Sequence, residues 1–283
     1  MKKYNYPIGF MQGRLSNKID NLIQAFPWDD WENEFLLAHE NSIQIMEWTL
    51  DAKRLYENPI MKKEGRKKIK HLCNKFNLSI PSLTGDCFMQ KPFWKSTNSE
   101  KLQKDFIEVC KSASSLGIKD IVIPLVDNGR LENSYQYKFL IDFLLSQNDF
   151  FIDQQIRILF ESEFDPSKLK TFISKFPKDT FGINYDIGNS ASLDYNSDEE
   201  FLNYGDRILN IHVKDRLKGG NTIALGHGNV DFKKVFKNIL NTFYKGNFIL
   251  QTARAEDNNH VRVILKYKKH IESLLEELSL SKK

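Results

Sequence analysis

The sequence predicts an α/β fold, a single (β/α)8 barrel that spans residues 1–283. Short apolar segments alternate along the chain with longer segments whose apolar residues recur at helical spacing. The length of 283 residues suits a barrel of this class, which typically has about 250. A doubly wound sheet would instead carry a glycine-rich phosphate loop after an early strand, and Gly9 and Gly13 do not form one.

The predicted strands are short and mostly apolar, because helices cover both faces of a parallel sheet. The segment 156–160, for example, reads Ile-Arg-Ile-Leu-Phe before Glu161. The segment 208–213 is also largely apolar but contains His212 near its end. In chain order, the predicted strands are residues 6–11, 42–46, 78–83, 120–126, 156–160, 181–185, 208–213 and 248–250.

The predicted helices are recognised by apolar residues three or four positions apart. The segment 99–116 has the clearest pattern, with Leu102, Phe106, Val109 and Ala113 on one face, and Gly117 is expected to end it. A loop with aromatic residues is expected before it, at 84–94. The predicted helices are residues 28–40, 59–76, 99–116, 135–151, 169–176, 199–204, 232–243 and 261–278.

The composition argues against several functional classes. The formal net charge is +4, and 41 basic residues nearly balance 37 acidic ones, so no nucleic-acid partner is expected. The densest basic run, 62–68, is interpreted as a solvated helix face. Neither a signal peptide nor a membrane span is found, and three widely spaced cysteines suit reduced thiols. The expected location is therefore the cytoplasm, with no membrane partner.

Four successive predicted strands end in residues that could bind a metal ion. They are Glu161, Asp186, His212 and Gln251. In a barrel, the C-terminal ends of the strands form the active face, so these side chains should meet at one mouth. Their oxygen and imidazole ligands suit one divalent ion, such as Mn²⁺, Mg²⁺, Co²⁺ or Zn²⁺. The alternative is that each is an isolated polar residue where a strand meets solvent.

Other polar residues lie at the same ends of the early and late strands. Glu47 is expected to follow the second strand, where it either serves as a second proton-transfer base or orients loops. Arg14 and Arg254 either hold a phosphate or carboxylate or tie loops together. The remaining candidates for contact with a substrate are Gln12, Asp86 and His227. The loop aromatics Phe88, Phe93 and Trp94 either stack on the substrate or simply roof the barrel.

The motifs at these strand ends resemble those of the xylose isomerase-like TIM barrels, the sugar phosphate isomerase/epimerase and AP endonuclease family 2 superfamily. The pieces that carry the resemblance run from the first strand to the eighth. They are residues 8–16, Glu47-Trp48, Gly85-Asp86, Phe160-Glu161, Tyr185-Asp186-Ile-Gly-Asn189, His212-Val-Lys-Asp-Arg216, residues 225–232 and Phe248-Ile-Leu-Gln-Thr-Ala-Arg254.

The resemblance implies that Glu161, Asp186, His212 and Gln251 are the metal ligands. It also implies that Arg216 contacts a substrate oxygen and that Asn189 takes the place of a substrate-binding histidine. One departure is Gln251, where the epimerases usually carry a glutamate. An amide can ligate through its oxygen but cannot transfer a proton, so Glu161 is the expected base, with Glu47 second.

The function implied is a divalent-metal-dependent isomerase or epimerase of a ketose, sugar phosphate or related polyol, acting through an enediolate. A dehydratase of the same barrel family and a catalytically inactive sugar-binding barrel remain as alternatives. A nuclease is disfavoured, because that branch needs many strand-end histidines and only His212 is clearly at one. The expected partner is a small sugar or sugar phosphate, and a homodimer is left open.

Overall fold

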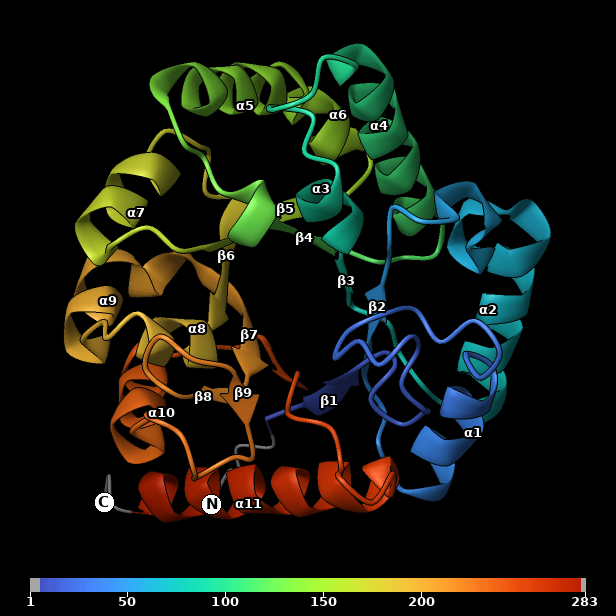
Figure 1. The fold of residues 1–283 in the computed structure, drawn as a ribbon, viewed down its shortest axis with the longest axis vertical. Coiled ribbons are helices and arrows are strands. Elements are labelled where there is room, and N and C mark those ends of the chain that lie inside the picture. Colours follow the sequence, from blue (N-terminus) through green and yellow to red (C-terminus); the bar gives the residue numbers. More distant parts are fainter. Residues whose placement is uncertain (1–5, 281–283) are drawn as a thin grey trace.

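The structure, a computed structural model, describes residues 6–280. Eight parallel strands close into a barrel in the order β1-β10-β7-β6-β5-β4-β3-β2, and helices surround it (Figure 1), so the predicted (β/α)8 barrel is confirmed. The barrel strands are β1 Ile8–Met11, β2 Met46–Thr49, β3 Ser82–Thr84, β4 Asp120–Leu125, β5 Arg157–Ser162, β6 Phe181–Asp186, β7 Ile208–Val213 and β10 Asn247–Leu250. A separate hairpin pairs β8 Asp215–Arg216 with β9 Thr222–Ile223.

The helices follow the predicted alternation. Several begin at a side chain that caps the first turn, as when Asp165 accepts from the backbone N–H of Lys168 ahead of Pro166. The α-helices are α1 Asn33–Glu40, α2 Lys63–Phe76, α3 Asp86–Gln90, α4 Ser99–Ser115, α5 Ser134–Ser146, α6 Asn148–Asp153, α7 Pro166–Ile173, α8 Ile187–Ser192, α9 Ser197–Tyr204, α10 Phe232–Asn241 and α11 His260–Leu280. The 3-10 helices are η1 Leu55–Glu57, η2 Pro59–Met61, η3 Asp127–Gly129 and η4 Gly205–Arg207.

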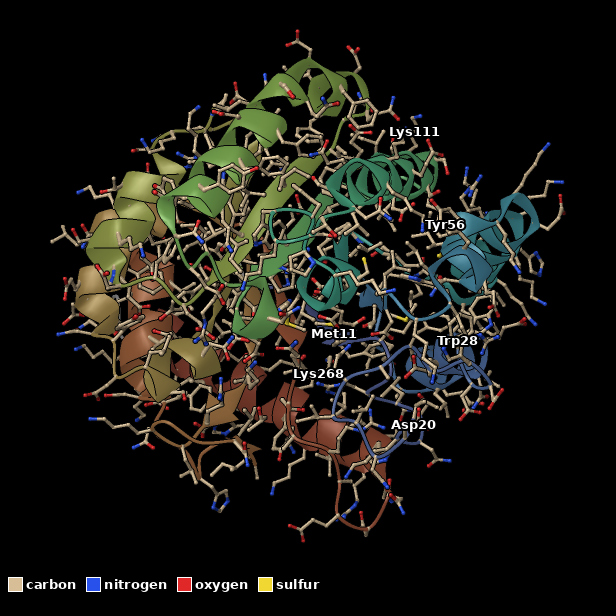
Figure 2. The ribbon with its side chains drawn as sticks, turned by 45° about the horizontal axis from the view of Figure 1, so that its top comes forward. Met11, Asp20, Trp28, Tyr56, Lys111 and Lys268 are labelled. Atoms are coloured by element: carbon tan, nitrogen blue, oxygen red, sulfur yellow. The ribbon has the colours of Figure 1, made fainter. Side chains whose placement is uncertain are left out.

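The boundaries differ from the prediction in places that affect the site. β2 covers Met46–Thr49 instead of 42–46, so Glu47 lies inside the strand and not after it. The predicted helix 28–40 begins only at Asn33, and the predicted helix 135–151 is interrupted at Gln147. Before α1, a long segment from Met11 through Asp20 to Trp28 winds over one side of the barrel (Figure 2).

The aromatic side chains of the segment 84–94 are buried and do not form the open stacking surface that was expected. The segment contains the short helix α3, and Phe88, Phe93 and Trp94 are 5%, 1% and 2% exposed. The ring of Phe88 packs edge-on against that of Phe106, with 5.0 Å between the ring centroids. The indole N–H of Trp94 donates to the backbone oxygen of Gly129 at 3.1 Å. The prediction that these rings stack on a sugar is therefore wrong, because contacts with α4, α5 and η3 bury them.

Two further expectations can be compared with the described residues. Within residues 6–280, no helix is both long enough and apolar enough to cross a membrane. Cys73, Cys87 and Cys110 are free thiols, as expected from their spacing.

Candidate metal centre and active site

Glu161, Asp186 and His212 meet at the mouth of the barrel. They come from the adjacent strands β5, β6 and β7, and in the register of the sheet Asp186 lies directly beside His212. Each offers one ligand atom, and these atoms all lie within 4.8 Å of one another. The residues are only 5%, 4% and 0% exposed. Buried carboxylates placed together need a positive partner, and this cluster could hold a metal ion.

His212 is fixed between two carboxylates. Its Nε2 lies 2.6 Å from Oε1 of Glu47, and its Nδ1 lies 3.1 Å from Oε2 of Glu161. Burial alone would lower the pKa of His212, but Glu47 and Glu161 outweigh it and raise the pKa to about 10. When Nε2–H donates to Glu47, the lone pair of Nδ1 is directed towards the cluster, as a metal ligand requires once that nitrogen is deprotonated.

Glu47 is completely buried beneath His212 and does not face the mouth. Its carboxylate accepts hydrogen bonds from Ser82 Oγ and Thr84 Oγ1, both at 2.5 Å, and from Asn210 Nδ2 at 2.8 Å. Burial alone would raise the pKa of Glu47, but the charge of His212 and these hydrogen bonds have the larger effect, so the pKa lies below its ordinary value. The expectation that Glu47 is a second proton-transfer base does not match this geometry, which makes Glu47 the residue that orients His212.

Lys214 enters the same cluster, although the sequence analysis assigned it no role. Its Nζ lies 2.6 Å from Oδ2 of Asp186 and 3.1 Å from Oε1 of Gln251. The side-chain oxygen of Gln251, the residue after β10, is therefore linked to the expected ligand Asp186 through the Lys214 ammonium. Apart from this ion pair with Lys214, that Asp186 oxygen has no further partner among residues 6–280. The signal for Lys214 was a second polar residue shortly after His212 at the end of an apolar strand.

Glu161 is held by two asparagine amides. Asn189 Nδ2 donates to its Oε1 at 2.7 Å, and Asn184 Nδ2 donates to its Oε2 at 2.9 Å. Burial alone would raise the pKa of Glu161, but the hydrogen bond and the positive charge of His212 have the larger effect and lower the pKa, so the carboxylate is ionised. Arg216 Nη1 donates in turn to Asn189 Oδ1 at 2.7 Å. The two residues expected to contact the substrate thus also position Glu161.

Asp86 and Gln12 are buried at the ends of the early strands. Asp86, the first residue of α3, is 8% exposed. Burial raises the pKa of Asp86 to about 8, assisted by the charges of Asp51 and Glu161. Gln12 accepts from the backbone N–H of Thr49 at 3.2 Å, while its Nε2 has no partner among residues 6–280.

Arg14 and Arg254 join the segments that follow β1 and β10. Arg14 Nε donates to the backbone oxygen of Thr252 at 3.0 Å, and its Nη1 donates to that of Ile23 at 2.7 Å. Arg254 donates to the backbone oxygens of Gly13 and Ser16. These hydrogen bonds correspond to the loop-tying alternative for the two arginines, and the Nε of Arg254 is buried without a partner within residues 6–280.

His227 lies away from the metal-ligand cluster. It is exposed, in the loop that follows β9. Asp215 stabilises that loop, because its Oδ2 accepts hydrogen bonds from the backbone N–H groups of Gly226 at 2.8 Å and Gly228 at 2.9 Å. The structure does not bring His227 into contact with the other expected site residues.

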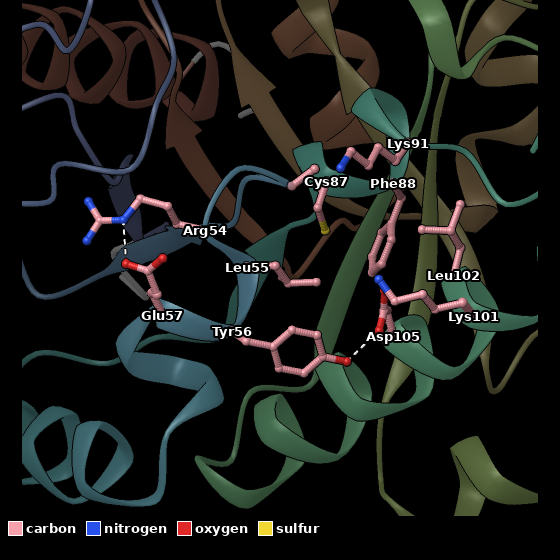
Figure 3. Close-up of a pocket in the computed structure, with 11 residues that line it drawn as sticks. Arg54, Leu55, Tyr56, Glu57, Cys87, Phe88, Lys91, Lys101, Leu102 and Asp105 are labelled. Atoms are coloured by element: carbon pink, nitrogen blue, oxygen red, sulfur yellow. Dashed lines mark hydrogen bonds and ion pairs between the residues drawn. The ribbon is translucent and has the colours of Figure 1, made fainter. Parts of the chain in front are cut away.

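A small cavity of about 280 Å³ opens between η1, α3 and α4 (Figure 3). Tyr56 crosses it to donate a hydrogen bond to Asp105, and Arg54 pairs with Glu57 at 2.6 Å. None of the expected metal ligands lines it, so this cavity is separate from the strand-end cluster.

Comparisons with solved structures agree with the fold. A xylose isomerase domain protein from Planctomyces limnophilus is 13% identical, with a TM-score of 0.75 over 97% of this chain and 98% of that one. A xylose isomerase-like TIM barrel protein from Mycobacterium smegmatis in complex with magnesium is 15% identical, with a TM-score of 0.73 over 97% and 98%. A D-tagatose 3-epimerase-like protein is 16% identical, with a TM-score of 0.72 over 98% and 100%.

Identities this low support the shared fold alone. No curated protein sequence matches significantly. A family profile described as a xylose isomerase-like TIM barrel matches residues 35–276. Because this match covers most of the sequence, the chain belongs to the xylose isomerase-like TIM-barrel family.

Proposed function

We propose that this protein is a divalent-metal-dependent isomerase or epimerase of a ketose, sugar phosphate or related polyol, acting through an enediolate. The observation that carries the proposal is the buried cluster of Glu161, Asp186 and His212 at the barrel mouth. Two relatives in fold support it by their descriptions, one as D-tagatose 3-epimerase-like and one as a magnesium complex.

The residues that would hold the ion are Glu161, Asp186, His212 and the side-chain oxygen of Gln251. Two carboxylates, an imidazole and an amide oxygen suit Mg²⁺, Mn²⁺, Co²⁺ or Zn²⁺. When bound, such an ion polarises a substrate carbonyl and stabilises the negative charge of the enediolate. Lys214 lies 2.6 Å from Asp186, so it adds a second positive charge to the same side of the site.

Glu161 is the base that we assign to proton transfer. Its carboxylate is ionised, it is 5% exposed at the mouth, and Asn184 and Asn189 fix its orientation. These features suit a base that removes a proton from the carbon beside a carbonyl. Gln251 cannot return a proton on the other side, because its amide is neither an acid nor a base near neutral pH.

Asp86 is the remaining expected carboxyl at the mouth that interacts with Glu161. Burial, and the charges of Asp51 and Glu161, raise its pKa to about 8, which leaves it largely protonated at neutral pH. A protonated carboxyl suits a proton donor better than a base. We therefore assign donation to Asp86 and abstraction to Glu161.

Solvent deuterium incorporation into a panel of ketoses and ketose phosphates tests this function. Wild-type protein with Mn²⁺ should exchange one carbon-bound hydrogen of its substrate, and Glu161→Gln should lose the exchange. Glu108→Gln, on the exposed face of α4, is the matched control and should exchange like wild type. If wild-type protein binds Mn²⁺ but exchanges no ketose, the enzyme proposal fails and the sugar-binding barrel is favoured.

The dehydratase alternative shares the first proton abstraction and is separated by its products. An isomerase or epimerase returns a sugar of unchanged mass apart from deuterium, whereas a dehydratase releases water. Mass spectrometry of the same reactions therefore distinguishes them.

A further inference from the structure

Glu200, a carboxylate outside the metal-ligand cluster, is buried among three hydroxyl groups. It lies on α9 and is 2% exposed. Its Oε2 accepts hydrogen bonds from Tyr185 Oη at 2.7 Å and from Ser190 Oγ at 2.5 Å. Its Oε1 accepts from Tyr204 Oη at 2.7 Å. A buried carboxylate is costly unless donors surround it, so these three hydroxyls stabilise Glu200 at this position.

Two of the three donors belong to the segment that carries the metal centre. Tyr185 directly precedes Asp186 in β6, and Ser190 directly follows Asn189 in α8. The helix that carries Glu200, α9, lies beside α8 (Figure 1). Because both donors bind the same carboxylate oxygen, Glu200 fixes the end of β6 and the body of α8 relative to each other.

The placement of α8 depends on such contacts. The helix has only six residues, and isolated helices of this length are not stable in water. Asp186 is its N-cap, with Oδ1 accepting from the backbone N–H of Asn189 at 2.8 Å. This bond ties the start of the helix to the proposed metal ligand. The bond from Ser190 to Glu200 ties the same helix to α9.

The other contacts of α8 reach the reacting groups. Asn189 Nδ2 donates to Glu161 Oε1 at 2.7 Å, so the helix carries a group that orients the proposed base. Gly188 lies directly against Lys214, because a Cβ at position 188 would lie only 2.9 Å from Lys214 Cγ. A shift of α8 would therefore move Asn189 away from Glu161 and change the packing of the lysine that pairs with Asp186.

From these contacts we infer that Glu200 is a positioning residue of the metal centre, which fixes Asp186 through Tyr185 and the Asn189 amide through Ser190. Residues that orient metal ligands without touching the ion affect metal affinity in many proteins. This role rests on the proposed function, since it concerns the ligands and the base of the same site. The alternative is a cluster that only packs α9 against the barrel, so that its hydroxyls contribute to stability and not to metal affinity.

Three single-hydroxyl deletions separate the two roles, because each removes one hydrogen bond from the same carboxylate. Glu200 itself stays in place, since its replacement would leave three buried hydroxyls without their acceptor. Tyr185→Phe and Ser190→Ala act on the segment that carries the site. Tyr204→Phe is the matched control, because its hydroxyl reaches Glu200 from α9 and, among residues 6–280, bonds to no residue of β6 or α8.

Calorimetric titration with Mn²⁺ is the first measurement, with thermal unfolding of every variant beside it. All three variants should lose stability. Tyr185→Phe and Ser190→Ala should bind Mn²⁺ about fivefold more weakly or worse, whereas Tyr204→Phe should stay within about twofold of wild type. Equal affinities in the three variants, whether reduced or not, overturn the inference and leave the proposed function standing. Wild-type protein that binds no Mn²⁺ refutes both.

Deuterium exchange at saturating Mn²⁺ tests the connection to Glu161 separately. Ser190→Ala should exchange about fivefold more slowly than Tyr204→Phe, because the Asn189 amide then holds the base less firmly. Equal exchange rates in these two variants refute the role of Glu200 in positioning Glu161.

Discussion

Glu47→Gln is the substitution that most directly tests how the metal centre is built. The carboxylate accepts from Ser82, Thr84, Asn210 and His212, at 2.5 to 2.8 Å. A glutamine retains one acceptor oxygen and turns the other position into a donor that faces donors. With the amide oxygen at the Oε1 position, His212 keeps an acceptor, but the amide N–H groups then face Asn210 Nδ2, which is also a donor, and the negative charge beside His212 is lost.

The expected loss follows from the role of such partners. Changing a group that orients a metal-binding histidine typically costs 10- to 100-fold in metal affinity, or about 1.4 to 2.7 kcal/mol. Calorimetric titration with Mn²⁺ measures it, with Glu108→Gln as the exposed control. A dissociation constant within twofold of wild type would refute the reasoning, provided that thermal unfolding shows a folded protein.

Three further predictions concern the site and its supporting loops. His212→Ala should abolish stoichiometric Mn²⁺ or Zn²⁺ binding in a metal analysis, and a variant that retains the metal would contradict the ligand assignment. Gln251→Glu should still bind Mn²⁺, because a carboxylate oxygen replaces the amide oxygen beside Lys214, and loss of Mn²⁺ binding would count against it. Burial raises the pKa of Glu34 to about 7 from 4.5, so the folded protein holds a proton there that the unfolded chain releases. This stabilisation of the folded state is therefore present below about pH 4.5, falls as the pH rises through 7, and amounts to about 3 kcal/mol. Glu34→Gln should remove this pH dependence, which is measured by comparing urea unfolding at pH 5 and pH 8.

The barrel could be predicted because its signals are local. Parallel strands covered on both faces read as apolar runs, and a polar residue at the end of such a run marks the mouth. Glu161, Asp186 and His212 carried this signal, and the structure brings them within 4.8 Å. The side-chain oxygen of Gln251 accepts from Lys214 at 3.1 Å, and Lys214 in turn pairs with Asp186.

Long-range contacts explain what the sequence did not predict. Glu47 looked like the end of a strand, because a carboxylate inside a barrel strand is costly unless donors surround it. Those donors come from β3 and β7, the latter more than 160 residues away. Phe88 and Trp94 looked like a sugar platform for a similar reason, since the partners that bury them, Phe106 on α4 and Gly129 in η3, lie outside the loop itself.

Gln251 and Lys214 have to be considered together. The Lys214 ammonium lies between Asp186 and the amide oxygen of Gln251, so it places a fixed positive charge on one side of the cluster. A glutamate at position 251 would pair with that ammonium and add a second ionised carboxylate to the site. The glutamine instead leaves the lysine paired with Asp186 and removes one basic group from that side.

The site is therefore asymmetric, with a single ionised base in Glu161, and we expect proton return to depend on a different group, for which Asp86 is the candidate. If Asp86→Asn keeps metal binding and exchanges deuterium as fast as wild type but loses net conversion, donation by Asp86 is supported. Unchanged conversion would instead show that Glu161 both removes and returns the proton.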